Sequence, residues 1–386
     1  MKVNFIVAPS FLRTAEKTDP FYDPIISTID GREGLDWKVF VWRKGLECGY
    51  PSACLGDYRL LDACATWFYR ACRLVAWKAP AWTIYYVFGR VARPFFARKF
   101  KADIVITQSG QFASLLAGLL PLVRIVDIQH GVIYSRHSGY FDETGRLLPV
   151  HQACANREFW VYGQGFADCF FKHPDNARDL NGRVKVIGDV IRHPRVDRHI
   201  KKLIVVSGQF KPECGRQCLL DQVERLREFL NEVDSMFAGG CKVLLKHHPR
   251  FKGVDALDLL YKDFPFFEET KESWEKLYVA MKIHVTFSST VVFDAASNGI
   301  ISYLIPPPNN DPVLENCFWR DDYHYPYFGK SFKGIVSLCD AEGTAATIKD
   351  WYAKYYEPFS EQKCLELLTK KGGHHEDRSI AYRSRE

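Results

Sequence analysis

A group of basic and imidazole side chains directly follows a short apolar run at residues 241–245. This group, called the HP segment below, comprises residues 246–250 and includes Lys246, His248 and Arg250. Histidine and lysine donate hydrogen bonds to phosphate, arginine binds it with two parallel bonds, and the proline fixes the turn. The segment therefore suits an anionic ligand such as a phosphate. A solvated basic loop is the alternative.

Three consecutive hydroxyl residues form a second candidate. Ser288, Ser289 and Thr290, called the SS turn below, follow an apolar run at residues 282–286 and open a predicted helix. Hydroxyl groups and free backbone N–H groups at a helix start bind anions. Taken alone, the turn is better explained as an ordinary helix cap. The HP segment and the SS turn together, which we expect on adjacent strand ends of one sheet, are far more specific than either.

A third candidate, His130, ends the apolar run 123–129 and precedes a glycine. A histidine in such a place can act as general base on an acceptor hydroxyl, and glycine permits close approach of the backbone. A structural histidine that caps the turn is the alternative. Nearby, His137, Tyr140 and Asp142 belong to a polar loop that we expect to line the acceptor side.

Two further residues complete the set of candidates. Glu158 stands just before a predicted strand at residues 159–163, where a carboxylate could serve in acid–base chemistry, although a solvated glutamate explains it better. Gln209 follows the predicted strand 202–207, and we assign it to the donor side.

The HP segment and the SS turn resemble two motifs of the GT-B glycosyltransferases that build bacterial surface polysaccharides. This group includes bacterial sialyltransferases, Kdo transferases and the related CDP-glycerol phosphotransferases. The resemblance covers the C-terminal half of the chain well and the N-terminal half in outline. It implies that His248 and the hydroxyls of the SS turn contact the phosphate of a cytidine-activated donor. The phosphotransferases also carry a His-Gly pair similar to that at His130.

The chain departs from these relatives at the catalytic carboxylates. The acidic motif that supplies the base of sialyltransferases has no clear copy, and no residue aligns with the carboxylate nucleophile of retaining Kdo transferases. The resemblance therefore leaves the catalytic base and the stereochemical outcome open.

The elements that must position these residues alternate between strand and helix. Short apolar runs predict strands at residues 1–9, 36–42, 102–107, 123–129, 159–163, 184–188, 202–207, 241–246, 282–286 and 300–305. Helical patterns occupy residues 112–120, 216–233, 255–261, 290–298, 341–356 and 360–370. The alternation predicts two parallel-sheet α/β domains. The resemblance implies the GT-B arrangement, in which two Rossmann-like domains face each other across a cleft.

We expect an acceptor-binding domain at residues 1–190 and a nucleotide-sugar-binding domain at residues 200–340. C-terminal helices and a tail would occupy residues 341–386.

Residues 63–99 combine many aromatic side chains with seven basic ones. We expect Pro80 and Pro94 to divide this segment into separate helices. Aromatic residues mixed with cations suit a helix on an anionic membrane surface. Core-facing insertion helices are the alternative and explain the pattern slightly better.

Composition narrows the class further. Hydrophobic residues make up 47% and charged residues 25%, which is typical of a folded globular protein. The net charge of +6 is small for a dedicated nucleic-acid binder and fits anionic ligands or an anionic membrane face. The 12 cysteines include no CxxC pair, which favours reduced thiols in a cytoplasmic protein over a zinc site.

Several patterns are absent from the sequence. The phosphate loop, the GxGxxG turn after the first strand and the GxSxG elbow are missing, which disfavours kinases, dinucleotide oxidoreductases and α/β-hydrolases. The chain has no D-x-D pair to hold a metal, no secretory signal and no apolar run of the ~20 residues that span a membrane.

The resemblance to the GT-B family, together with these observations, implies a metal-independent glycosyltransferase without a cofactor. It would move a CMP-activated ulosonic acid, Kdo or a sialic acid, onto a glycan or lipid-linked glycan of capsule, O-antigen or lipopolysaccharide. The alternative is a CDP-glycerol or CDP-ribitol phosphotransferase of teichoic-acid-like polymers. A non-catalytic binding protein and a non-hydrolysing sugar-nucleotide epimerase share the architecture, and the epimerase's carboxylate-rich site is a poor match. We expect a cytoplasmic location, which can include the inner face of the cytoplasmic membrane, and no nucleic-acid partner.

Overall fold

The chain folds into two compact units. The computed structural model describes residues 1–7, 18–41, 53–54, 59–75, 79–99, 101–108, 110–190, 196–197, 203–208, 216–238, 240–248, 255–306 and 318–370. The first unit is Met1–Ile191 together with Glu357–Glu386, and the second is Arg192–Tyr356. The expected C-terminal segment 341–386 is thus divided between the units, because the chain leaves the second unit after Tyr356 and returns to the first.

The first unit is built on a parallel sheet with the strand order β3-β2-β1-β4-β5-β6-β7. Its strands are β1 (Lys2–Val7), β2 (Asp36–Val41), β3 (Ala53–Cys54), β4 (Ile104–Thr107), β5 (Arg124–Ile128), β6 (Arg157–Val161) and β7 (Val184–Val186). The central strands are apolar runs buried on both faces, as a parallel sheet covered by helices requires.

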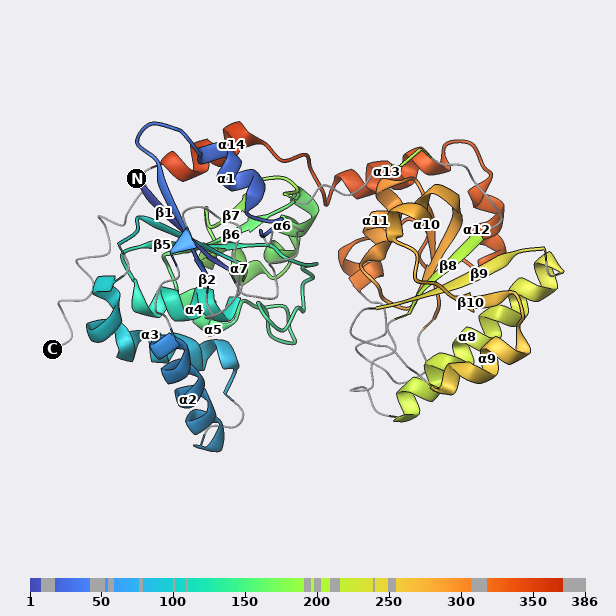
Figure 1. Cartoon of the computed structure of the whole chain (residues 1–386), viewed down its shortest axis with the longest axis horizontal. Helices are drawn as coiled ribbons and strands as arrows, with labels where there is room; N and C mark the ends of the chain where they lie inside the picture. The colour runs from blue at the N-terminus through green and yellow to red at the C-terminus, as the bar shows by residue number, and fades with distance from the viewer. Residues whose placement is uncertain are drawn as a thin grey trace. The chain divides into compact units, whose positions relative to one another are not determined.

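Helices cover both faces of this sheet (Figure 1). They are α1 (Asp23–Ile29), α2 (Arg59–Val75), α3 (Ala81–Phe96), α4 (Gly110–Leu119), α5 (Pro149–Ala153), α6 (Gln164–Phe171), α7 (Pro174–Asp179) and α14 (Glu361–Thr369), with a short 3₁₀ turn at Ala97–Lys99. Helices α3 and α4 approach backbone to backbone through Gly89 and Gly118. A Cβ atom at Gly89 would collide with the Leu115 carbonyl, and one at Gly118 with the Tyr86 carbonyl.

The second unit is built on a smaller parallel sheet with the strand order β10-β9-β8-β11-β12. Its strands are β8 (Leu203–Gly208), β9 (Lys242–His247), β10 (Phe267–Glu269), β11 (Met281–Thr286) and β12 (Ile301–Leu304). Strands β9 and β10 lie on one side of β8, and β11 and β12 lie on the other. Successive strands are therefore added first on one side of β8 and then on the other. Ligands of such sheets bind at the carboxyl ends of the strands where this order reverses, which here is between β8 and β11.

Helices also cover both faces of the second sheet (Figure 1). They are α8 (Arg216–Phe237), α9 (Asp258–Asp263), α10 (Trp274–Ala280), α11 (Val291–Ser297), α12 (Phe332–Cys339) and α13 (Thr344–Ala353), with a 3₁₀ turn at Asp255–Leu257 and a π-helical turn at Phe318–Asp322. One hydrophobic core of this unit joins the buried side of α8 to the sheet and to α12. In both units, the Rossmann-like parallel-sheet architecture agrees with the prediction.

Two local predictions differ from the structure. The strand expected at residues 159–163 is β6, which begins two residues earlier and therefore contains Glu158. Pro94 does not break the helical segment, since α3 continues to Phe96. Pro94 lies near the end of α3, and both Pro94 and Arg90 are exposed, so water can reach the carbonyl group that loses its helical partner.

Candidate functional site

The carboxyl edge of the second sheet brings the HP segment and the SS turn onto either side of β8. Ser207, near the end of β8, pairs with Lys246 of β9 in one direction and with Thr286 of β11 in the other. The two segments were expected on adjacent strands. The structure corrects this expectation, because β8 lies between their strands.

The start of the HP segment is fixed to the end of β8. The backbone N–H of His248 donates a hydrogen bond of 3.0 Å to the carbonyl of Gly208. Lys246 is partly buried as a residue, and its ammonium group donates to the carbonyl of Glu272 at 2.5 Å. Two predicted donor-side residues, Gln209 and Arg250, lie outside the described residues.

The three hydroxyl residues of the SS turn divide into two kinds. Ser289 is buried and shapes the turn: its N–H donates to the hydroxyl of Thr286 at 3.0 Å, and its own hydroxyl accepts from the N–H of Val291 at 3.3 Å. Ser288 is partly buried and Thr290 is exposed. Within the described residues, their hydroxyls make no hydrogen bond, so these two are the better placed to contact a ligand.

A buried line of polar groups runs beneath the SS turn, and the sequence did not reveal it. The two ring nitrogens of His284 in β11 are hydrogen-bonded to the hydroxyls of Ser207 at 2.9 Å and Ser302 at 2.8 Å. The Thr286 hydroxyl donates to the carbonyl of Ser207 at 3.2 Å. Burial lowers the pKa of His284 to about 3, so its ring is neutral. This line connects three neighbouring strands to the turn that carries the hydroxyls.

Tyr325 extends the line at the far side of β12. Its hydroxyl accepts from the N–H of Ser302 at 2.7 Å and lies 3.1 Å from the Ser302 carbonyl, to which it donates. Burial raises the pKa of Tyr325, which therefore stays protonated as a donor. Such a network ties strand ends together, because each of its buried polar groups depends on the next for a partner.

In the first unit, His130 follows β5 and is exposed, and its neighbour Gln129 is buried. The Gln129 amide accepts from the N–H of Tyr162 at 2.9 Å and donates to the carbonyl of Gly131 at 2.7 Å. The Tyr162 hydroxyl donates to the Gln129 carbonyl at 2.5 Å. Three hydrogen bonds therefore hold the turn that presents His130 to the carboxyl edge of this sheet.

His137 lies within electrostatic range of His130. Burial, and to a smaller extent the charge of His130, lowers the pKa of His137 to about 4. Its Nδ1 atom accepts from the N–H of Gly139 at 3.1 Å, and its ring contacts those of Tyr134 and Tyr140. The structure thus brings together two predicted residues, His130 and His137, and the latter is neutral at physiological pH.

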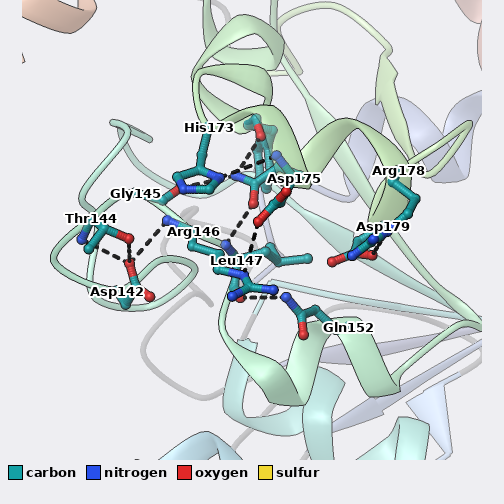
Figure 2. Close-up of polar contacts among 12 residues, drawn as sticks. Asp142, Thr144, Gly145, Arg146, Leu147, Gln152, His173, Asp175, Arg178 and Asp179 are labelled. Carbon is teal, nitrogen blue, oxygen red and sulfur yellow. Dashed lines mark hydrogen bonds and ion pairs between the residues drawn. The ribbon is translucent and has the colours of Figure 1, made fainter.

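The other two residues of the expected acceptor loop are occupied by structural contacts. Tyr140 is buried among aromatic rings, including Phe159 and Phe170, and burial raises the pKa of its hydroxyl. It is therefore a core residue and does not line an acceptor surface. A carboxylate oxygen of Asp142 accepts from the N–H and hydroxyl of Thr144 and from the N–H of Arg146 (Figure 2). These hydrogen bonds lower the pKa of Asp142, with the Thr144 hydroxyl contributing most.

Glu158 lies at the opposite end of its strand from the ligand-binding edge. It is the second residue of β6, and both of its carboxylate oxygens accept from Arg124, at 2.7 and 2.8 Å. The indole N–H of Trp160 donates to the same carboxylate at 3.1 Å. This geometry favours a structural ion pair, and we do not retain Glu158 as a catalytic group.

A buried carboxyl group at the carboxyl edge of the first sheet was also missed. The Gln108 amide, directly after β4, donates to both carboxyl oxygens of Asp19 at 2.8 Å, and the N–H of Phe21 donates to one of them at 2.9 Å. Burial raises the pKa of Asp19 to about 7. Sequence patterns could not reveal this pair, because 89 residues separate its members.

No group of three or more histidine, cysteine, aspartate or glutamate side chains in the described part of the chain could hold a metal ion. Among the described residues, no helix is both long and apolar enough to cross a membrane.

Two Rossmann-like parallel-sheet units in one chain are the architecture of the GT-B fold. A comparison of the sequence with known protein families finds no match. A comparison with curated proteins likewise finds no match.

Solved structures share the fold. One is a UDP-GlcNAc 2-epimerase from Neisseria meningitidis bound to UDP-GlcNAc, with a TM-score of 0.51, 11% identity and coverage of 96% of this chain and 100% of the other. Another is the glycotransferase of kitacinnamycin, with a TM-score of 0.51, 9% identity and coverage of 95% and 98%. At these identities the likeness concerns the fold, and it confirms the predicted GT-B class.

Proposed function

We propose that this protein is a glycosyltransferase that moves a CMP-activated ulosonic acid, Kdo or a sialic acid, onto a glycan of a bacterial surface polysaccharide. The observation that carries the proposal is the position of the HP segment and the SS turn on either side of β8. This is the edge at which a doubly wound sheet binds its ligand.

The second unit would hold the donor. His248 and Lys246, with Arg250 and Gln209, would bind the phosphate and the nucleotide, and the hydroxyls of Ser288 and Thr290 would donate to the phosphate oxygens. Positive side chains and hydroxyl donors stabilise the negative charge that grows on a leaving phosphate. The chemistry of the leaving group can therefore proceed with these protein groups alone.

The first unit would hold the acceptor and supply the base. In the proposed step, the acceptor oxygen bonds to the anomeric carbon while the bond from that carbon to the CMP phosphate oxygen breaks. The electron pair leaves with the phosphate, and the acceptor proton passes to His130. A histidine is suited to this task because its ordinary pKa lies near neutrality.

We place the reaction in the cytoplasm, at the inner face of the cytoplasmic membrane, where a lipid-linked glycan acceptor is accessible. The second candidate is a CDP-glycerol or CDP-ribitol phosphotransferase. It is favoured by His130 and His248, which follow strand ends in the first and second units, since such an enzyme would use both histidines. The two reactions release the same nucleotide, CMP, so the transferred group must be identified directly.

Calorimetric titration with CMP, CDP, UDP and GDP, without added metal, tests the donor class. We expect selective binding of cytidine nucleotides. His248→Ala should weaken CMP binding roughly 10- to 100-fold, the value of a charge-assisted hydrogen bond. Thr290→Val should also weaken it, whereas Thr347→Val, an exposed hydroxyl on α13, is the matched control. Preference for UDP or GDP would refute the cytidine donor, and unchanged affinity in His248→Ala would refute the role of the HP segment.

The role of His130 is tested by the same titration together with a product assay using CMP-Kdo and CMP-sialic acid. His130→Ala should lower turnover roughly 10²- to 10⁴-fold, as expected when a general base is lost. CMP affinity should not change. Full turnover in this variant would remove His130 from the mechanism.

A further inference from the structure

Helices α2 and α3 expose large apolar side chains in the first unit. Trp67 and Leu74 on α2 are 75% and 87% exposed, and Val91 and Phe95 on α3 are 58% and 74% exposed. Single exposed apolar residues are ordinary, but four large ones on two helices that pack against each other are unusual. This set of four side chains is called the α2–α3 surface below.

The opposite sides of these helices are already anchored in the unit. Phe88 and Ala92 of α3 are buried in the core that includes α4. Phe68 of α2 packs on Phe88, and Tyr69 stacks on Tyr85 of α3 with ring centroids 5.6 Å apart. The exposed apolar side chains are therefore a second face of helices that the fold holds in place, and they are not core residues displaced from their partners.

The same stretch of chain is strongly basic. Between Asp62 and Asp103 the sequence contains eight Arg and Lys residues and no Asp or Glu. The whole chain has a net charge of only +6, so the rest of the molecule is slightly negative. The positive charge of this protein is thus concentrated on the segment that carries the α2–α3 surface.

The arginines of this stretch project into solvent. Arg70, Arg90, Arg93 and Arg98 are exposed, and in the described parts of the chain none of these four forms an ion pair with a carboxylate. An exposed guanidinium group that has no acidic neighbour attracts phosphate strongly.

We infer that the α2–α3 surface docks on an anionic lipid bilayer. The aromatic and aliphatic side chains would enter the boundary between headgroups and acyl chains, and the arginines would contact lipid phosphates. A second copy of the chain is disfavoured as occupant, because each copy would bring the same eight positive charges. The inference deepens the proposed function. It rests on that function only for the biological role of the membrane contact, which is to give access to a lipid-linked acceptor.

Vesicle sedimentation of the full chain tests the inference without any nucleotide. We expect binding to vesicles of phosphatidylcholine with phosphatidylglycerol, little binding to phosphatidylcholine alone, and a decline with added salt. Arg90→Glu with Arg93→Glu should weaken binding at least 25-fold, since each arginine near the surface contributes roughly fivefold. Trp67→Ser with Phe95→Ser should weaken binding but leave its salt dependence intact.

The matched control is Leu259→Ser with Lys262→Glu, which changes one exposed apolar and one exposed basic residue on α9 of the second unit. This variant should bind vesicles like the original chain. Thermal unfolding of every variant checks that the fold is retained. The inference would be overturned if vesicle binding did not depend on lipid charge. It would also be overturned if the control variant lost as much vesicle binding as the test variants. A dimer in gel filtration that the α3 variants abolish would overturn it too, because the surface would then belong to a second copy.

The outcome separates this inference from the proposed donor. Vesicle binding without cytidine binding would support the membrane surface and remove the donor class. Cytidine binding without vesicle binding would support the donor class and overturn the membrane surface.

Discussion

His284 links the candidate donor site to the interior of the second unit. Its ring bridges the hydroxyls of Ser207 and Ser302, which belong to the strands on either side of β11. Sequence patterns did not single it out, because a histidine within an apolar strand has the same local context whether it serves as a ligand or as a buried bridge. Only the neighbouring strands supply its two partners, and these lie 77 and 18 residues away in the chain.

The neutral ring of His284 makes stability depend on pH in a defined direction. Its pKa is about 3 in the folded protein and about 6.5 in the unfolded chain, so between these values the unfolded chain binds more protons. Its contribution is complete above pH 6.5 and is lost as the pH falls, at about 1.4 kcal/mol per unit. From pH 7 to pH 5, we expect a loss of about 2 kcal/mol from this group.

Urea unfolding at pH 7 and pH 5 measures this effect. His284→Gln, which stays neutral, should show a smaller loss between the two pH values than the original chain. Other buried histidines, such as His151, have a lowered pKa of the same sign, so the difference between the two proteins isolates His284. An identical pH dependence in both proteins would contradict the assigned burial.

At the level of elements, α3 and α4 depend on two glycines at their crossing. Gly89 and Gly118 allow each helix to touch the other's backbone carbonyl groups. This contact carries α3, and α2 packed on it, outward from the sheet (Figure 1). This arrangement explains why the aromatic-rich helices α2 and α3 are buried on one face and exposed on another. The core-facing interpretation of residues 63–99 accounts for the buried face, and the membrane interpretation stays a prediction for the exposed face.

Gly118→Val should destabilise the first unit by about 1–3 kcal/mol, because the added side chain must displace the backbone of α3. Val91→Ala, an exposed change on α3, should stay within about 0.5 kcal/mol and serves as the control. Chemical denaturation of both variants measures the difference. Equal stabilities would show that the two helices can separate without penalty.

For the molecule as a whole, the first unit is completed by a segment that is distant in the sequence, because the chain returns to it at Glu357. The N–H of Glu357 donates to the Tyr162 carbonyl, and the N–H of Asp189 donates to the Glu357 carbonyl. Further along, Arg124 donates to the carbonyl of Leu367 at 2.6 Å, while α14 packs against α1. Residues from both ends of the sequence therefore complete one unit.

Leu368→Ala should destabilise the first unit by about 2–5 kcal/mol, since this side chain is fully buried. Hydrogen exchange should become faster in α1 and α14 and stay unchanged in α8 of the second unit. The exposed Leu259→Ala is the control. Faster exchange throughout both units would contradict a local role for this segment.

The sequence by itself determined the features that depend on local patterns. Short β-branched runs alternating with amphipathic helices specified two parallel sheets, because each strand must be buried on both faces. The same patterns located His130, Lys246 and the SS turn at strand ends, where parallel sheets present ligand-binding residues.

The tertiary structure decided which strands are neighbours and which polar groups meet. It inserted β8 between the HP segment and the SS turn, paired Glu158 with Arg124, and buried Tyr140 among aromatic rings. It also joined Asp19 to Gln108 and returned α14 to the first unit. These outcomes depend on contacts between segments that are distant in the chain. Local hydrophobic periodicity cannot specify them, because it records which face of an element is buried and not which element covers it.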